Sequence, residues 1–103
     1  MADPMRIRAA VKGDVTEVKI LMSHPMETGQ RKDASGQLVP AHFIDKLTAT
    51  CNGKTVLTAD WGPAVSKNPF LAFRFKGAKA GDKLSVTWVD TAGATRTDEA
   101  TIA

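Results

Sequence analysis

The chain of 103 residues has only one cysteine, and it has no long run of apolar residues. A single thiol cannot form an internal disulfide, so a disulfide framework is excluded. No stretch approaches the roughly 18 apolar residues of a membrane-spanning helix, and residues 1–5 lack the apolar segment of a secretory signal. Taken by itself the sequence predicts a cytoplasmic protein, although a processed or co-exported protein would look the same.

The basic residues form no stripe, even though the net charge is +3. They are spread along the chain with acidic residues between them, and the only adjacent pair, Arg31 and Lys32, is followed by Asp33. Nucleic-acid binding needs clustered cations with aromatic side chains among them. We therefore expect neither a nucleic-acid partner nor a membrane partner.

Catalytic motifs are also lacking. The sequence has no nucleophile elbow, no glycine-rich phosphate loop, no zinc-ligand spacing and no pair of carboxylates on one strand face for acid–base work. His24 and Glu27 are close enough in sequence to pair, but such residues in a loop more commonly bond to backbone at the surface. We expect a protein that is not an enzyme and that holds no cofactor.

What the sequence does have is alternation of apolar and polar residues with a period of two, which is typical of half-buried strands. Turn signals such as Asn52–Gly53 separate the segments. The predicted strands cover residues 6–12, 17–22, 43–51, 54–59, 71–76, 84–89 and 94–102. This pattern predicts an all-β fold, an immunoglobulin-like antiparallel β-sandwich of about seven strands, with a small closed barrel as the alternative. Residues 1–103 are expected to form a single domain in which residues 1–4 are flexible.

Cys51 lies in the third predicted strand, in phase with Phe43, Leu47 and Ala49 and opposite Ile44. This phase places the thiol on the core face, where cysteines are commonly inert and have a raised pKa. We interpret Cys51 as a structural thiol. Contact with a partner chain and a reactive thiol are the alternatives.

The longest interruption of the strand pattern lies between Ser23 and His42. Connections in compact domains usually take about 4–6 residues, and one of more than about 15 is commonly functional or disordered. This loop holds both histidines, and its glycines at Gly29 and Gly36 allow turns that display residues 31–33 near an apex. We expect a recognition surface, with a mobile hairpin extension of no function as the alternative.

A copper site is the second interpretation of this loop. Met22, His24 and Met26 lie at its start and His42 at its end, and thioether and imidazole groups are suitable ligands for copper. A free-standing copper-binding chaperone is therefore the alternative function. Against it, Met22 continues the apolar face of its strand and is expected to pack in the core.

The sequence resembles the SoxZ family over nearly its whole length. The similarity rests on the run SHPMETGQRKD at residues 23–33, followed by Gly36, the pair at 39–40 and Phe43. Further matching motifs follow in order at residues 52–53, 67–70, 80–82 and 87–90. Several spaced motifs in the right order are more specific than any one of them.

The resemblance implies a periplasmic β-sandwich that forms a heterodimer with SoxY, the subunit whose C-terminal cysteine carries sulfur during thiosulfate oxidation. It also implies transient contacts with other Sox enzymes and export together with SoxY. This chain ends in residues 99–103 without a Gly-Gly-Cys-Gly-Gly arm, so we expect the docking half of the carrier. Three apolar residues that lie off the main core face of their predicted strands are candidates for the partner surface: Leu21, Ile44 and Val89. The residues expected to form the docking loop are His24, Met26, Glu27, Thr28, Gly29, Arg31, Lys32 and Asp33.

Overall fold

The computed structural model describes residues 4–62 and 65–103, and within these ranges the regular structure is all β, with no helix. The expectation that residues 1–4 are flexible falls mainly on residues 1–3, which lie outside the described residues. Seven strands follow one another along the chain. They are β1 (Arg6–Lys12), β2 (Val15–Leu21), β3 (Ile44–Cys51), β4 (Lys54–Asp60), β5 (Phe70–Lys76), β6 (Lys83–Asp90) and β7 (Thr95–Thr101).

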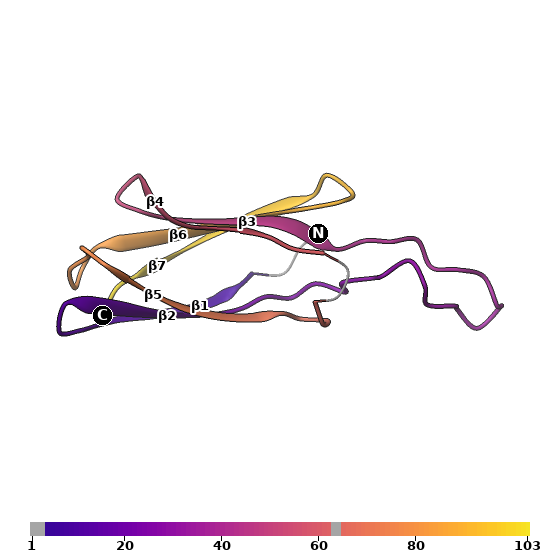
Figure 1. Ribbon diagram of the computed structural model, residues 1–103, viewed down its shortest axis with the longest axis horizontal. Coiled ribbons are helices and arrows are strands. Elements are labelled where there is room, and N and C mark those ends of the chain that lie inside the picture. Colours follow the sequence, from indigo (N-terminus) through magenta and orange to yellow (C-terminus); the bar gives the residue numbers. More distant parts are fainter. Residues whose placement is uncertain (1–3, 63–64) are drawn as a thin grey trace.

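The strands form two antiparallel sheets that pack face to face as two layers (Figure 1). The three-stranded sheet has the order β1-β2-β5, and the four-stranded sheet has the order β4-β3-β6-β7. Two separate sheets make the molecule a β-sandwich, as the alternation predicts, and not the closed barrel. No described residue belongs to a helix long and apolar enough to cross a membrane.

The core lies between the layers and is built from the inward residues of the alternating strands. The core cluster includes Val18 and Ile20 of β2, Leu47 of β3 and Trp88 of β6, and all four are almost completely buried. Met22, directly after β2, is buried as well. The packing confirms the expectation that Met22 belongs to the core.

One prediction about the third strand is wrong. The sequence pattern places Ile44 on the outer face, whereas the structure buries it completely. The register between β3 and β6 shifts between Ile44 and Lys46, because Asp45 is an extra residue on β3. A bulge of this kind turns the preceding side chain to the other face of the sheet. Ile44 is therefore a core residue and not a candidate for the partner surface.

The connection between β2 and β3, residues 22–43, projects from one end of the sandwich as a long hairpin (Figure 1). We call it the arm. The molecule measures 53 Å along its long axis and 20 Å across each of the other two, and the arm extends along the long axis. The sandwich therefore presents this loop well away from its own surface.

Candidate functional site

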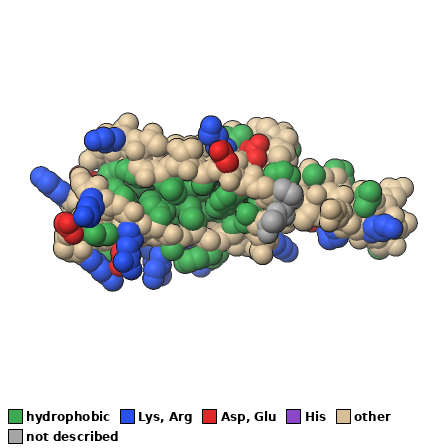
Figure 2. All heavy atoms as spheres, in the orientation of Figure 1, with side chains coloured by type: hydrophobic (Ala, Val, Ile, Leu, Met, Phe, Trp, Pro, Cys, Tyr) green, Lys and Arg blue, Asp and Glu red, His purple; other side chains and the backbone are tan. Residues whose placement is uncertain are grey.

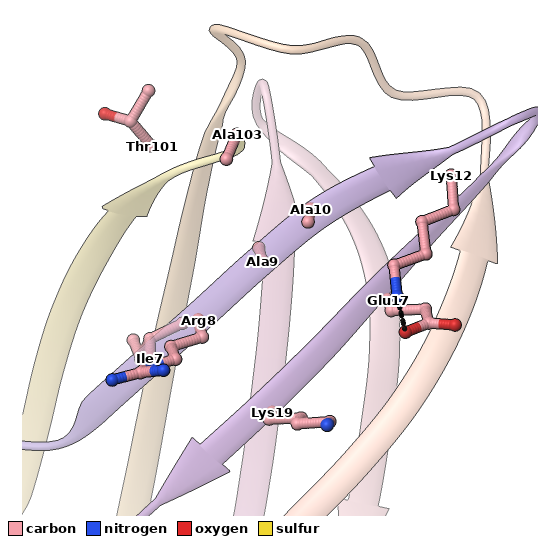
Figure 3. A pocket seen from close by; sticks show the side chains of 9 residues that line it. All are labelled: Ile7, Arg8, Ala9, Ala10, Lys12, Glu17, Lys19, Thr101 and Ala103. Carbon is pink, nitrogen blue, oxygen red and sulfur yellow. Dashed lines mark ion pairs between the residues drawn. The ribbon is translucent and has the colours of Figure 1, made fainter.

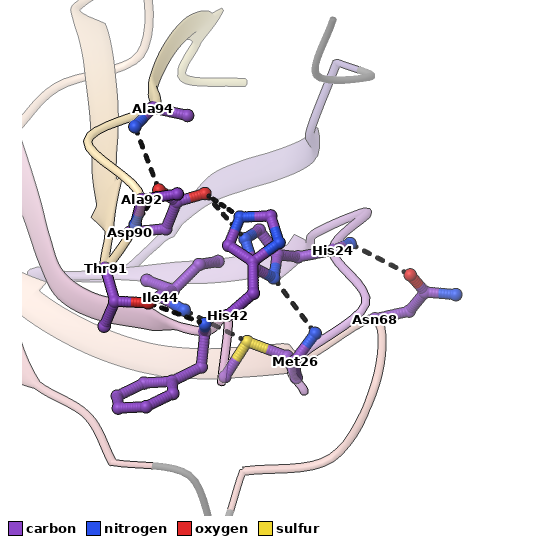
Figure 4. A network of polar contacts seen from close by, with 10 residues as sticks. His24, Met26, His42, Ile44, Asn68, Asp90, Thr91, Ala92 and Ala94 are labelled. Atoms are coloured by element: carbon purple, nitrogen blue, oxygen red, sulfur yellow. Dashed lines mark hydrogen bonds and ion pairs between the residues drawn. The ribbon is translucent and has the colours of Figure 1, made fainter. Parts of the chain in front are cut away.

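Three side chains close the base of the arm (Figure 4). His24 comes from the start of the arm, His42 from its end, and Asp90 from the end of β6. Oδ2 of Asp90 lies 3.0 Å from Nε2 of His24 and 2.7 Å from Nε2 of His42. Both ends of the arm are thus tied to the same carboxylate oxygen.

The bonding around His24 defines its tautomer. The backbone N–H of Met26 donates to Nδ1 of His24 at 3.0 Å, and a backbone N–H can only be a donor. Nδ1 therefore accepts, and Nε2 carries the proton that His24 donates to Asp90. The ring also packs edge-on against Trp88, with centroids 5.2 Å apart, and it is 4% exposed. His24 is a fixed internal donor, which corrects the expectation of a surface histidine.

Asp90 is held from its other side by the turn after β6. Its Oδ1 accepts the backbone N–H groups of Ala92 and Ala94 at 3.0 and 2.9 Å. Burial alone raises the pKa of Asp90, but hydrogen bonds from His24, His42 and Ala94 outweigh it, so the pKa lies below its ordinary value. Asp90 is therefore an ionised acceptor with donors at both oxygens, and it fixes the arm to the sandwich.

Further bonds hold the start of the arm against the residues before β5. The side chain of Asn68 accepts the backbone N–H of His24 at 3.0 Å, and the backbone N–H of Asn68 donates to the carbonyl of His24 at 2.9 Å. Met26 takes a left-handed backbone conformation, with φ of 49°, and its sulfur accepts the N–H of Ile44 at 3.3 Å. The start of the arm is ordered by contacts on two sides.

The two chains of the arm pair at Glu27 and His42, whose backbone groups exchange bonds of 2.7 and 2.9 Å. Nε of Arg31 donates to both carboxylate oxygens of Glu27, at 3.0 and 2.9 Å. This bond raises the pKa of Arg31. The ion pair positions the guanidinium along the arm, while 59% of the Arg31 side chain remains exposed.

Gly29 lies close to Ala41 on the returning chain of the arm. Its φ is +87°, and a Cβ atom at this position would lie 3.1 Å from Cβ of Ala41. Only glycine adopts this backbone conformation without strain and leaves room for the neighbouring side chain. The tight pairing of the arm depends on this residue.

The tip of the arm is organised by Asp33. Its Oδ1 accepts the hydroxyl of Ser35 at 2.7 Å and the backbone N–H groups of Ser35 and Gln37 at 2.9 and 3.1 Å. The Ser35 hydroxyl and the Gln37 amide lower the pKa of Asp33. Lys32 pairs through its backbone with Leu38, which is 60% exposed. Asp33 therefore shapes the turn, and the side chains on display near it are Arg31, Lys32 and Leu38.

Among the described residues, candidate metal ligands meet at the base of the arm. One ligand atom each from His24, His42 and Asp90 lie within 4.8 Å of one another. A metal on Nε2 of His24 would displace the proton to Nδ1, where it would face the N–H of Met26. Met22 is buried in the core, and the Met26 sulfur already accepts a bond from Ile44. The donor set suits a hydrogen-bonded anchor better than a copper site.

Cys51 lies at the far end of β3 from the arm and is 7% exposed. Burial raises the pKa of its thiol, and the charge of Asp82 raises it further. A thiol with a raised pKa is mostly protonated at neutral pH and is a poor nucleophile. Cys51 lies on the core face as expected, and its role as a structural thiol stays a prediction.

Sequence reasoning located the arm but not the residues that anchor it. Of the residues expected to form the docking loop, His24 and Met26 are buried at the base of the arm, whereas residues 27–33 are half-buried or exposed along it. Asp90 and Asn68 were missed, since the first looks like a turn residue and the second like part of a loop. Two histidines at the two ends of one loop are the signal that could have suggested a shared partner.

Comparison with known proteins gives a family and a fold. The family model described as "Sulphur oxidation protein SoxZ" matches residues 5–101. A comparison with curated proteins finds no match. Among solved structures, a superoxide reductase in the oxidised state is similar with a TM-score of 0.64 and 19% identity, over 99% of this chain and 89% of that one.

Two further solved structures are similar over the whole sandwich. A hypothetical protein from Pyrococcus horikoshii OT3 has a TM-score of 0.62 and 19% identity, with 99% of this chain and 89% of that chain covered. A variant of the superoxide reductase neelaredoxin from Archaeoglobus fulgidus, in the reduced form, has a TM-score of 0.59 and 22% identity, with 97% and 86% covered. At these identities the similarity extends to the fold alone.

Proposed function

This chain belongs to the SoxZ family of sulphur oxidation proteins, and from that membership we propose that it is the docking subunit of a SoxYZ sulfur-carrier heterodimer. Family membership gives it a role in the Sox system of sulfur oxidation. In the proposed complex SoxY carries the sulfur covalently on its own cysteine. This chain performs no chemistry itself and presents the loaded partner to the Sox enzymes, including during thiosulfate oxidation.

The observation that carries the proposal is the anchored arm. A loop extension without a function does not need a buried carboxylate with donors at both oxygens. Asp90 nevertheless accepts bonds from both ends of the arm and from its own turn. Such a base orders the arm before binding, which reduces the entropy lost when a partner docks. The exposed cations Arg31 and Lys32 then supply contacts for an acidic surface or an anionic sulfur adduct.

The proposed place of action is the periplasm. In this proposal the chain reaches the periplasm by pairing with a signal-bearing SoxY before export. Fractionation of cells with and without SoxY tests this part of the proposal. Periplasmic accumulation of this chain in cells that lack SoxY would contradict it.

Charge reversal on the arm tests the docking role. We expect Arg31→Glu and Lys32→Glu each to lower the rate of thiosulfate oxidation by the reconstituted Sox system about tenfold, while the affinity for SoxY stays within about twofold. Lys83→Glu is the matched control, since Lys83 is exposed at the opposite end of the sandwich. Pull-down and turnover are measured on the same preparations.

If the arm variants lose SoxY and turnover together, the arm belongs to the heterodimer interface. If they lose neither, it is not a docking surface. The alternative function, a copper-binding chaperone, is checked by titration with Cu(I) and Cu(II) in the presence of a competing chelator. Stoichiometric binding that His24→Ala abolishes would favour the chaperone.

A further inference from the structure

The two long sides of the sandwich differ. On one side the end of the chain bridges the layers, because the N–H of Val11 donates to the carbonyl of Ala103 at 3.0 Å and the N–H of Ala103 donates to the carbonyl of Ala9 at 2.9 Å. On the other side β4 and β5 are the outer strands of their sheets, and each pairs with only one neighbour. We call this second side the β4–β5 side.

Apolar side chains line the β4–β5 side. Figure 2 shows them as a continuous band along the long axis between the two layers. Their members come from both outer strands and from the residue after β4, and all are only partly buried against the core. They are Leu57, Ala59, Trp61, Leu71, Phe73 and Phe75. Aromatic residues grouped in this way are enriched at protein interfaces and rare on free surfaces.

The backbone of β5 makes this side fit for an extended polypeptide. β5 pairs with β2 in an unbroken register over all of Phe70–Lys76, so its other edge presents regularly spaced N–H and C=O groups. The register between β4 and β3 shifts between Ala49 and Thr50, and a bulge of this kind protects an edge from pairing. A lipid or small apolar ligand would fill the band but would leave the β5 edge unpaired.

The charges beside β5 distinguish a different chain from a second copy. Arg74 and Lys76 project from the outer face of β5, with 72% and 74% of their side chains exposed, and they pair with Glu17 at 3.4 Å and Asp14 at 3.6 Å. The strand residues of this sheet face still carry more cations than acids, because Glu17 also pairs with Lys12. On the same sheet face Arg8 stands opposite Lys19, a pair of like charges that costs stability. Figure 3 shows both cations beside a groove of about 470 Å³, where the one ion pair drawn joins Lys12 and Glu17.

Joining β5 to the β5 of a second copy would continue this basic face into another equally basic one. An acidic rim on the partner would instead neutralise it, and opposite charges across strands stabilise a sheet. The charges therefore favour a different polypeptide over self-association.

We propose that the β4–β5 side binds an apolar edge strand, rimmed by acidic residues, of the partner subunit, and that this strand pairs with β5 to extend the three-stranded sheet. The inference rests on the proposed function for the identity of the partner. It adds which side of the sandwich is the interface and what chemistry the partner presents.

Hydrogen exchange on the unmodified chain tests the inference, with SoxY from the same organism as the probe. We expect the β5 amides that face away from β2 to exchange at least about tenfold more slowly in the complex than in the isolated chain. Amides at the bridged side, in residues 101–103, should change by less than about twofold. Protection confined to the arm or to the bridged side would overturn the inference and leave the proposed function standing. Complete absence of binding to SoxY would overturn both.

Charge variants of β5 provide a second, independent test. The double substitution Arg74→Glu and Lys76→Glu changes only exposed side chains, so folding should be retained. We expect it to slow association with SoxY about tenfold at low salt. Lys12→Glu, on the same sheet face but at the opposite edge, should change the rate by less than about twofold. Equal effects of the two variants would contradict the inference.

Analytical sedimentation of the isolated chain tests whether a second copy of the chain binds at β5. We expect a monomer at concentrations where the SoxY complex is fully formed. A homodimer whose β5 amides are protected from exchange would show that a second copy is the occupant and would overturn the inference.

Discussion

At the scale of single residues, Asp90 connects the arm to the sandwich. Its two oxygens accept bonds from two imidazoles and two backbone amides, and its side chain is 1% exposed. A replacement that cannot accept these bonds would leave four donors, including the buried Nε2 of His24, without their acceptor. The anchoring of the arm therefore depends on one carboxylate that comes from a distant strand.

Replacement of this carboxylate by the isosteric amide should loosen the arm. Asp90→Asn presents an NH₂ group to two of the four donors, and we expect a loss of about 2–3 kcal/mol in the free energy of unfolding. Urea denaturation measures the change. Asp60→Asn, at an exposed residue at the end of β4, should stay within about 0.5 kcal/mol. Equal stability of the two variants would show that Asp90 is not an anchor.

The dependence of stability on pH follows from the lowered carboxyl pKa values. At Asp90, burial raises the pKa, but hydrogen bonds lower it by more. At Asp98, the hydrogen bond from Arg96 is the main cause of the lowered pKa. A group whose pKa is lower in the folded state stabilises the fold above its unfolded value, about 3.9 for aspartate. This stability is lost as the pH falls through the lower folded value.

We therefore expect the urea midpoint to be level between about pH 5 and 7 and to fall below about pH 4, with a smaller fall in Asp90→Asn. Asp33 and Asp82 also have lowered pKa values, but Asp33 is exposed and Asp82 is only half-buried, so solvent screening reduces their contribution. An identical acid profile for Asp90→Asn would mean that Asp90 does not contribute to the transition.

At the scale of elements, the arm is a hairpin whose pairing depends on one close approach. Gly29 and Gly36 both have a positive φ, of +87° and +84°, but only Gly29 has a neighbour within reach of an added Cβ. Both Gly29→Ala and Gly36→Ala should therefore strain the backbone by about 1–2 kcal/mol. Gly29→Ala should in addition push the two chains of the arm apart at Ala41.

Hydrogen exchange of the His42 amide, which donates to the carbonyl of Glu27, reports this difference. We expect Gly29→Ala to accelerate its exchange by at least about tenfold more than Gly36→Ala does. If both variants behave alike, the contact with Ala41 is not what closes the arm.

The elements were the most predictable part of the molecule. Period-two alternation located all seven strands, because half-buried strands leave this mark in the sequence. It failed at Ile44, since a bulge inserts Asp45 and reverses the faces, and a bulge has no signature in an alternating pattern. Asp90 lies 66 residues from His24 and 48 residues from His42 along the chain, so only the tertiary fold could reveal that it bonds to both.

At the scale of the whole molecule, the described residues divide the tasks among separate parts. The arm extends along the long axis and displays cations, the β4–β5 side is apolar, and the only cysteine is buried at the end opposite the arm. This division suits a subunit that holds one partner and meets others. Burial raises the pKa of the Cys51 thiol, and this agrees with the proposal that the covalent chemistry takes place on the partner.

The central claim is tested most directly by intact-mass spectrometry of the complex of this chain with SoxY after exposure to thiosulfate and the other Sox enzymes. We expect a sulfur-containing mass increment on SoxY and none on this chain, both with Cys51 present and in Cys51→Ser, whose complex should load SoxY equally well. An adduct on this chain that Cys51→Ser abolishes would contradict the account.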